Sequence, residues 1–177
     1  SELEVYGDRR MLSVLSSDRG TLRLSGAWDD AIFSSIDNEA VTGYDLLGVT
    51  GIPASVSVAN PTCVIYAPVN INVDCNVAVV NGKEAVATAF TLRDSHDFHL
   101  AMDVKVTGDV RFIPTAASDA MALTLPFDFV AAGGATAYCF FSLSDTNAAF
   151  TPCQRVNANT PFLLLSMPGA YITASDV

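Results

Sequence analysis

Short apolar runs separated by turn residues recur along this chain and predict β-strands. Within Val41–Asn81, the apolar runs Tyr44–Val49, Cys63–Ala67 and Val77–Val80 are each closed by Gly, Pro or Asn. Runs of this length with this punctuation are typical of buried strands rather than helices. We therefore expect the rest of the chain to be organised around these strands.

The residues before this stretch predict a strand, a short helix and a second strand. Leu22 and Leu24 in GTLRLSG would share one face of a strand, and the following WDDAIFSSI predicts one short helix near 29–37. Asp29 is suited to be the N-cap of that helix. Leu46 follows Leu24 by 22 positions. A strand–helix–strand period of this length is typical of leucine-rich repeats with parallel strands. Residues 1–19 show no clear pattern.

Farther along the chain the spacing becomes too short for crossover helices. Apolar runs at 63–67, 77–80, 89–92 and 104–106 recur every 12–15 residues. Such spacing favours an irregular parallel coil with one strand per turn. Asn81-Gly82 is the strongest hairpin dipeptide in the chain and favours the alternative, an antiparallel meander.

After Pro114 the strands become longer and their punctuation more regular. MALTLPFDFV, TAYCFFSL, AAFTPCQRV, TPFLLLSM and AYITASD alternate with turn-forming segments, which predicts an antiparallel sheet or small sandwich. The predicted fold is mainly β, with a leucine-rich-repeat-like or irregular parallel β-solenoid in residues 1–113 and an antiparallel β region in residues 114–177. We expect the two parts to share one continuous core.

The four cysteines allow one disulfide to be predicted from local geometry. If Asp145-Thr146-Asn147 forms a three-residue turn with Asn147 left-handed, Cys139 and Cys153 face each other across a hairpin. The favoured interpretation is nevertheless that all four cysteines are reduced, because free cysteines are commonly small core residues.

The order of several short motifs resembles one family. The segments GTLRLSGAWDDAIF, VTGYDLLGVTGIP, ANPTCVIYAP, VAVVNG, FTLRDSHDFH, LTLPFDFV and VNANTPFLLL are similar to leucine-rich-repeat-containing cell-surface proteins of Bacteroides-type gut bacteria. Thr62 departs from this pattern, which has Asn there, and the segment between Phe98 and Met121 is short. The resemblance implies a secreted or lipoprotein precursor and an exported chain at the cell surface, in the periplasm or at the outer membrane. It implies no enzymatic activity.

Charge and hydropathy exclude several classes of partner. The chain has 19 acidic and 9 basic residues, for a formal charge of −10. It lacks the Lys/Arg footprint that nucleic acids or anionic membranes require. No apolar run reaches the roughly 20 residues of a membrane-spanning helix. The opening SELEVYGDRR lacks the basic and apolar regions of a signal peptide, which a mature chain would lack as well.

The segment RDSHDFH contains the residue types of a divalent-metal site. In an extended strand only Asp97 and His99 share a face, whereas His96 points to the other. A polar turn in which Asp94 or Asp97 accepts backbone hydrogen bonds explains the segment equally simply, so we predict no metal and no cofactor.

Catalytic signatures are not apparent elsewhere in the sequence. There is no G-x-S-x-G motif and no phosphate-binding glycine loop. The cysteines lie in apolar strands, and strand alternation explains Asp128. We therefore predict a chain that is not an enzyme.

Aromatic side chains next to polar ones are the remaining candidates for a ligand site. Trp28, Asp29, Tyr44 and Tyr66 could form a stacking platform, although packing of the helix start on a strand also explains Trp28. The predicted function is a non-catalytic interaction or adhesion module that binds a protein or glycan at the cell surface. A carbohydrate-binding domain is the first alternative, and a hydrolase is the second.

Overall fold

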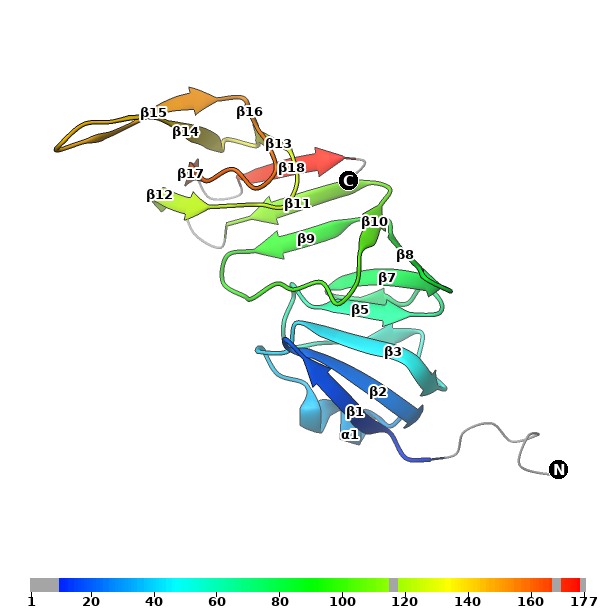
Figure 1. Ribbon diagram of the computed structural model, residues 1–177. Helices are drawn as coiled ribbons and strands as arrows, with labels where there is room; N and C mark the ends of the chain where they lie inside the picture. Colours follow the sequence, from blue (N-terminus) through cyan, green and yellow to red (C-terminus); the bar gives the residue numbers. More distant parts are fainter. Residues whose placement is uncertain (1–9, 115–117, 167–169, 176–177) are drawn as a thin grey trace. The chain divides into compact units, whose positions relative to one another are not determined.

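The computed structural model describes residues 10–114, 118–166 and 170–175 (Figure 1). The fold is mainly β, as predicted: stacked parallel strands form a β-solenoid of about five turns, and antiparallel sheets accompany it. The chain divides into two compact units, which we call the first unit (residues 1–90 and 96–106) and the second unit (residues 91–95 and 107–177).

The first unit contains the solenoid strands and the helix α1 (Figure 1). Among the described residues, its larger sheet has the order β1-β2-β3-β5-β7-β8-β10, and β4 pairs with β6. The bounds are β1 Ser13–Asp18, β2 Thr21–Ala27, α1 Asp30–Ile36, β3 Gly43–Thr50, β4 Ser55–Val56, β5 Val64–Ala67, β6 Asn72–Val73, β7 Asn76–Asn81, β8 Glu84–Ala87 and β10 Val104–Val106.

The predicted strand, short helix and second strand are present as one unit. Strands β2 and β3 are parallel, with Leu22 opposite Tyr44, and β3, β5 and β7 continue the parallel ladder. Asp29 is the N-cap of α1 and its carboxylate accepts a hydrogen bond of 2.9 Å from the Ile32 N–H. Phe33 is the buried residue of the helix, and it anchors α1 to the sheet through contact with Tyr44 at 4.8 Å between ring centroids.

The antiparallel pairing suggested by Asn81-Gly82 is also present, between β7 and β8. Strands β7 and β8 form an antiparallel hairpin in which Asn81 faces Glu84. Gly82 has φ of +62°, a conformation that a residue without Cβ adopts at little cost. Strand β10 then pairs parallel to β8. Strand β1 pairs antiparallel to β2, so the sheet combines a parallel ladder from β2 to β7 with antiparallel pairs on either side of it.

The second unit consists of two sheets with antiparallel pairing (Figure 1). Among the described residues, their orders are β16-β13-β18-β11-β9 and β12-β17-β14-β15. The bounds are β9 Phe90–Arg93, β11 Asp109–Ile113, β12 Ser118–Leu123, β13 Phe129–Ala132, β14 Thr136–Leu143, β15 Ala148–Cys153, β16 Arg155–Val156, β17 Phe162–Ser166 and β18 Tyr171–Ser175. The run at 89–92, expected as a solenoid turn, instead forms β9 beside β11.

The core of the second unit lies between its two sheets. Phe129 of β13 and Phe162 of β17 come from different sheets, and their ring centroids are 4.7 Å apart. Ala137 and Leu164, which face each other in β14 and β17, have no exposed surface. The four-stranded sheet thus buries Ala137, Phe162 and Leu164 on one face, whereas hairpin β14–β15 is exposed on both faces over most of its length.

Candidate interaction surface

Two of the predicted platform residues are core residues. Tyr44 and Tyr66 have no exposed surface, so neither ring can stack on a ligand. The Tyr44 hydroxyl donates a hydrogen bond of 2.7 Å to Asp37, and the Tyr66 hydroxyl accepts one of 2.9 Å from the Ala101 N–H. Burial raises the pKa of both phenols above the ordinary range. Their polar tips are satisfied inside the first unit, which is how buried tyrosines usually pack.

Trp28 and Asp29 stabilise the start of α1. The Trp28 ring is half-buried against Phe33, with 4.6 Å between centroids, and its indole N–H donates to Asp30 at 2.7 Å. Asp29 is exposed and caps the helix. With Tyr44 and Tyr66 inside the core, the four predicted residues do not form an exposed platform.

The segment around Asp97 and His99 forms an irregular connection between β9 and β10. Asp97 is exposed, and its carbonyl oxygen accepts a hydrogen bond of 3.5 Å from the Asn60 side chain. In the part of the chain that the structure describes, no group of three His, Cys, Asp or Glu side chains is arranged to hold a metal ion.

Asn60 and Asn76 are buried polar residues that the sequence reasoning missed. The Asn60 side chain donates to the Val41 carbonyl at 2.9 Å and accepts from the Thr62 N–H at 2.8 Å, and Asn76 donates to the Thr62 carbonyl at 3.2 Å. These bonds satisfy backbone groups where the chain turns between successive solenoid strands. Their recurrence just before apolar runs, in ANPTCVIYA and CNVAVV, is the signal that could have identified them.

The possible disulfide between Cys139 and Cys153 is present, so the expectation of four reduced cysteines is wrong, and the expected register is wrong as well. Cys139 and Cys153 are joined, with 6.1 Å between their Cα atoms. Asn147 does not adopt a left-handed conformation, and Leu143 faces Ala148 across a tighter turn. A bulge between Phe140 and Ser142 then shifts the ladder, so that Cys139 faces Thr151. The two cysteines are diagonal neighbours on one face of the hairpin.

The other two cysteines are free and lie in the solenoid. Cys63 is buried, and Cys75 is half-buried. The side-chain hydrogen bond with Cys75, together with burial, raises the pKa of the Cys63 thiol above the ordinary range. A thiol held protonated in this way is a poor nucleophile.

The outer face of the four-stranded sheet is apolar and accessible. Because side chains alternate along a strand, the register places one set of side chains on the face opposite Ala137 and Leu164. This set, which we call the open face, comprises Ala122, Thr136, Tyr138, Phe140, Leu143, Ala148, Phe150, Pro152, Leu163 and Leu165. Each of these residues is exposed or half-buried.

The exposed fractions are large for aromatic and aliphatic residues. Phe140, Leu143 and Phe150 are 56%, 75% and 38% exposed, and Phe141 at the bulge is 70% exposed. Hairpin β14–β15 extends beyond the end of β17 in Figure 1, so its turn has no neighbouring strand to cover it. A contiguous apolar patch on a soluble protein marks an interaction site more often than it marks a neutral surface.

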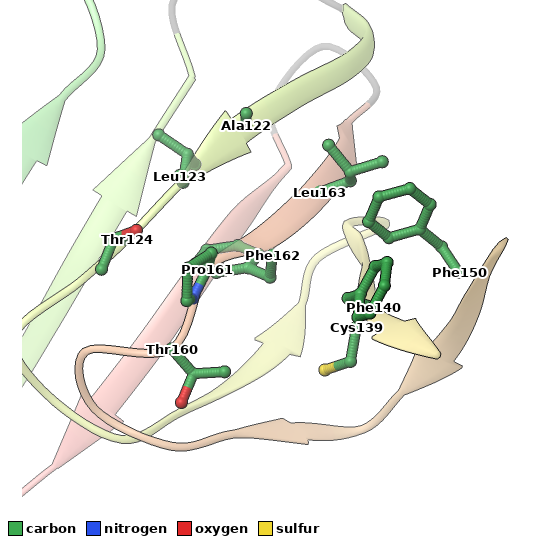
Figure 2. Close-up of a pocket in the computed structure, with 10 residues that line it drawn as sticks. All are labelled: Ala122, Leu123, Thr124, Cys139, Phe140, Phe150, Thr160, Pro161, Phe162 and Leu163. Carbon is green, nitrogen blue, oxygen red and sulfur yellow. The ribbon is translucent and has the colours of Figure 1, made fainter. Parts of the chain in front are cut away.

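A groove of about 740 Å³ lies along the strands of this sheet. Figure 2 shows the rings of Phe140 and Phe150 side by side, with Leu163 on the neighbouring strand. The residues that line the groove are Ala122, Leu123, Thr124, Cys139, Phe140, Phe150, Thr160, Pro161, Phe162 and Leu163. None is ionisable apart from Cys139, whose sulfur is in the disulfide, so the lining residues provide no acid or base.

The aromatic pair that lines the groove is arranged edge to face. The ring centroids of Phe140 and Phe150 are 5.9 Å apart, and the two ring planes meet at 80°. Ligand pockets combine apolar and aromatic side chains with a few polar groups that orient the ligand, and the hydroxyl groups of this lining are those of Thr124 and Thr160.

Charge is almost missing from this part of the chain. Within residues 136–153 Asp145 is the single charged residue of the sequence, and residues 161–175 contain none. Asp128, which lies outside the open face, accepts hydrogen bonds from Arg155 at 2.7 Å and from the Ala158 N–H at 2.8 Å. These two bonds lower the pKa of Asp128, which is therefore an ionised, structural carboxylate rather than a proton donor.

Comparison with known proteins assigns no family to the chain. No family model matches it, no curated protein matches it and no solved structure matches it.

Proposed function

We propose that this chain is a non-catalytic interaction module, exported to the cell surface, that binds a partner protein through the open face. The observation that carries this proposal is the exposure of Phe140, Leu143 and Phe150 on a sheet face whose described side chains are uncharged. Depletion of charge and enrichment in aromatic residues are the compositional features of the centre of a protein–protein interface.

The disulfide supports the exported location. Cys139 and Cys153 join the two strands of the hairpin that presents the open face. Disulfides persist in oxidising compartments and are rare in the reducing cytosol. A covalently closed hairpin also holds Phe140 and Phe150 in place before a partner arrives, which lowers the entropy that binding would cost.

The experiment is a binding assay against a panel of purified cell-surface and matrix proteins, with Phe140→Asp as the test variant. Val69→Asp is the matched control, because Val69 is 58% exposed in the first unit and the substitution changes the charge equally. We expect Phe140→Asp to weaken binding at least tenfold, because it places a carboxylate in a contact that excludes water. The Val69→Asp variant should bind like the wild type.

The same assay tests the alternatives. Equal binding by wild type and Phe140→Asp would overturn the open face as the binding surface. Binding on a glycan array, with no protein ligand in the panel, would favour the carbohydrate-binding alternative.

A further inference from the structure

The outer edge of β15 carries a second feature of the open face. Strand β15 is the last strand of the order β12-β17-β14-β15, and in the described chain no strand pairs with its outer side. An edge strand presents backbone N–H and C=O groups that another extended strand can pair with.

The pairing with β14 shows which β15 residues direct their backbone groups outward, because the direction alternates along the strand. The Asn147 carbonyl accepts a hydrogen bond of 2.8 Å from the Ser144 N–H, so the backbone of Asn147 faces β14. In an antiparallel strand the backbone groups alternate in direction. Those of Ala149, Thr151 and Cys153 therefore also face β14, and those of Ala148, Phe150 and Pro152 face outward.

The position of Pro152 agrees with this assignment. Proline lacks an N–H and is tolerated in a strand where that group would face away from the sheet. Pro152 lies opposite Tyr138 and points its backbone toward the free edge. The edge thus offers the N–H and C=O of Ala148 and Phe150, and the C=O of Pro152.

We propose that this edge pairs with the same edge of a second copy of the chain, in a two-fold symmetric antiparallel dimer centred on Phe150. In that register Phe150 exchanges both of its backbone hydrogen bonds with Phe150 of the second copy. By symmetry, the Ala148 N–H of each copy donates a hydrogen bond to the Pro152 carbonyl of the other copy. The missing Pro152 N–H affects only the Ala148 carbonyl at the outer end of the pair, where water can replace it.

Charge and symmetry favour a second copy as the occupant. Strand β15 contains no charged residue, so it neither repels its own copy nor selects an oppositely charged partner. Strand β15 also lacks lysine, which protects many edge strands from pairing, and its one proline removes a single N–H from the edge. A two-fold axis perpendicular to the sheet keeps both open faces on one side, where they form one continuous apolar surface.

This inference rests on the proposed function only in using the same sheet, and the experiment separates the two. Sedimentation equilibrium of the intact, oxidised chain should give a monomer–dimer equilibrium based on its 18.7 kDa mass. Raising the salt concentration should increase the dimer fraction, because each copy carries a formal charge of −10 and salt screens their repulsion. A chain that remains monomeric at every concentration and salt level would overturn the dimer.

Ala148→Pro tests the edge itself. It removes an outward N–H that does not take part in the ladder with β14 and leaves the apolar surface in place. We expect the dimer dissociation constant to rise about tenfold, as the loss of two hydrogen bonds predicts. Ala148→Ser, which keeps the N–H, is the control and should dimerise like the wild type. Unchanged dimerisation of a folded Ala148→Pro variant would overturn the edge pairing.

Phe150→Asp provides a second variant in case Ala148→Pro disturbs the hairpin. It places two carboxylates opposite each other at the two-fold axis, which opposes pairing. We expect it to remain monomeric where Val69→Asp still dimerises, and equal dimerisation of these two would again contradict the proposal. In the protein panel, Phe140→Asp should lose its partner and still dimerise.

Discussion

The two units differ in where their apolar side chains go. In the first unit Leu24, Tyr44, Leu46 and Ile65 have no exposed surface, and α1 packs Phe33 against them to close the end of the solenoid core. In the second unit the four-stranded sheet buries one face and leaves the other open. A closed core stabilises a fold, whereas an open apolar face provides the driving force for association.

Charge follows the same division. The first unit has thirteen acidic and six basic residues, whereas the second has six and three. The acidic first unit favours solubility, which offsets the tendency of an uncharged apolar sheet to associate without selectivity. This contrast agrees with the proposed function, in which the sheet binds a partner and the solenoid stabilises and solubilises the chain.

Replacing Leu46 should have the largest effect on stability. Leu46→Ala removes a side chain with no exposed surface, and we expect the free energy of unfolding to fall by about 2–5 kcal/mol. Leu47→Ala is the matched control, because Leu47 is 41% exposed and such substitutions usually change stability by less than about 0.5 kcal/mol. Urea unfolding measures both. Equal losses would contradict a closed core in the first unit.

Removing the disulfide should have the next largest effect, confined to the second unit. Cys139 and Cys153 are separated by 14 positions, and closing a loop of that size contributes about 3 kcal/mol. Hydrogen exchange should show faster exchange in β14 and β15 of a Cys139→Ser/Cys153→Ser variant, with β2 and β3 unchanged.

A thiol count by mass spectrometry is the control for that variant. The denatured, unreduced wild-type chain should react at Cys63 and Cys75 only. Reaction at all four cysteines without reductant would show that the disulfide does not form.

The smallest effect concerns Asp128 and Arg155 at the rim of the second unit. The hydrogen bonds from Arg155 and Ala158 lower the pKa of Asp128 in the folded chain. The ionised Asp128 therefore stabilises the folded state above the unfolded-state pKa of about 3.9. This stabilisation disappears as the pH falls through the lower, folded-state pKa. Asp128→Asn should lower the melting temperature slightly at neutral pH.

The difference between Asp128→Asn and the wild type should vanish in strong acid, where both side chains are neutral. Thermal unfolding followed by circular dichroism across the acid range measures it. A difference that stays constant with pH would mean that the effect of Asp128 is not electrostatic.

Local patterns were sufficient to predict much of the first unit. The Asp29 cap, the apolar stripe of α1 and the Leu24–Leu46 period depend on neighbours close in sequence, so the helix and the parallel strands β2 and β3 followed from them. The platform prediction was wrong for Tyr44 and Tyr66 because an aromatic residue next to polar ones looks the same in sequence whether exposed or buried. Burial is set by residues far along the chain.

The cysteine pair shows how a tertiary arrangement can alter a local prediction. Turn length suggested that Cys139 faces Cys153. The bulge after Phe140 moved the register, and the disulfide formed between diagonal neighbours instead. A bulge changes the pairing of every residue beyond it, and the sequence carries little signal for its position.

The sequence by itself determined the short strands, the helix cap, the hairpin at Asn81-Gly82 and the scarcity of charge in residues 136–153, because each depends on neighbouring residues or on composition. The tertiary structure alone decided which face of each strand is covered. The alternation of Tyr138, Phe140 and Leu143 would suit a buried face as well as an open one. Only the packing of β17 and β14 against the other sheet, through Phe162 and Ala137, leaves their opposite face free to bind.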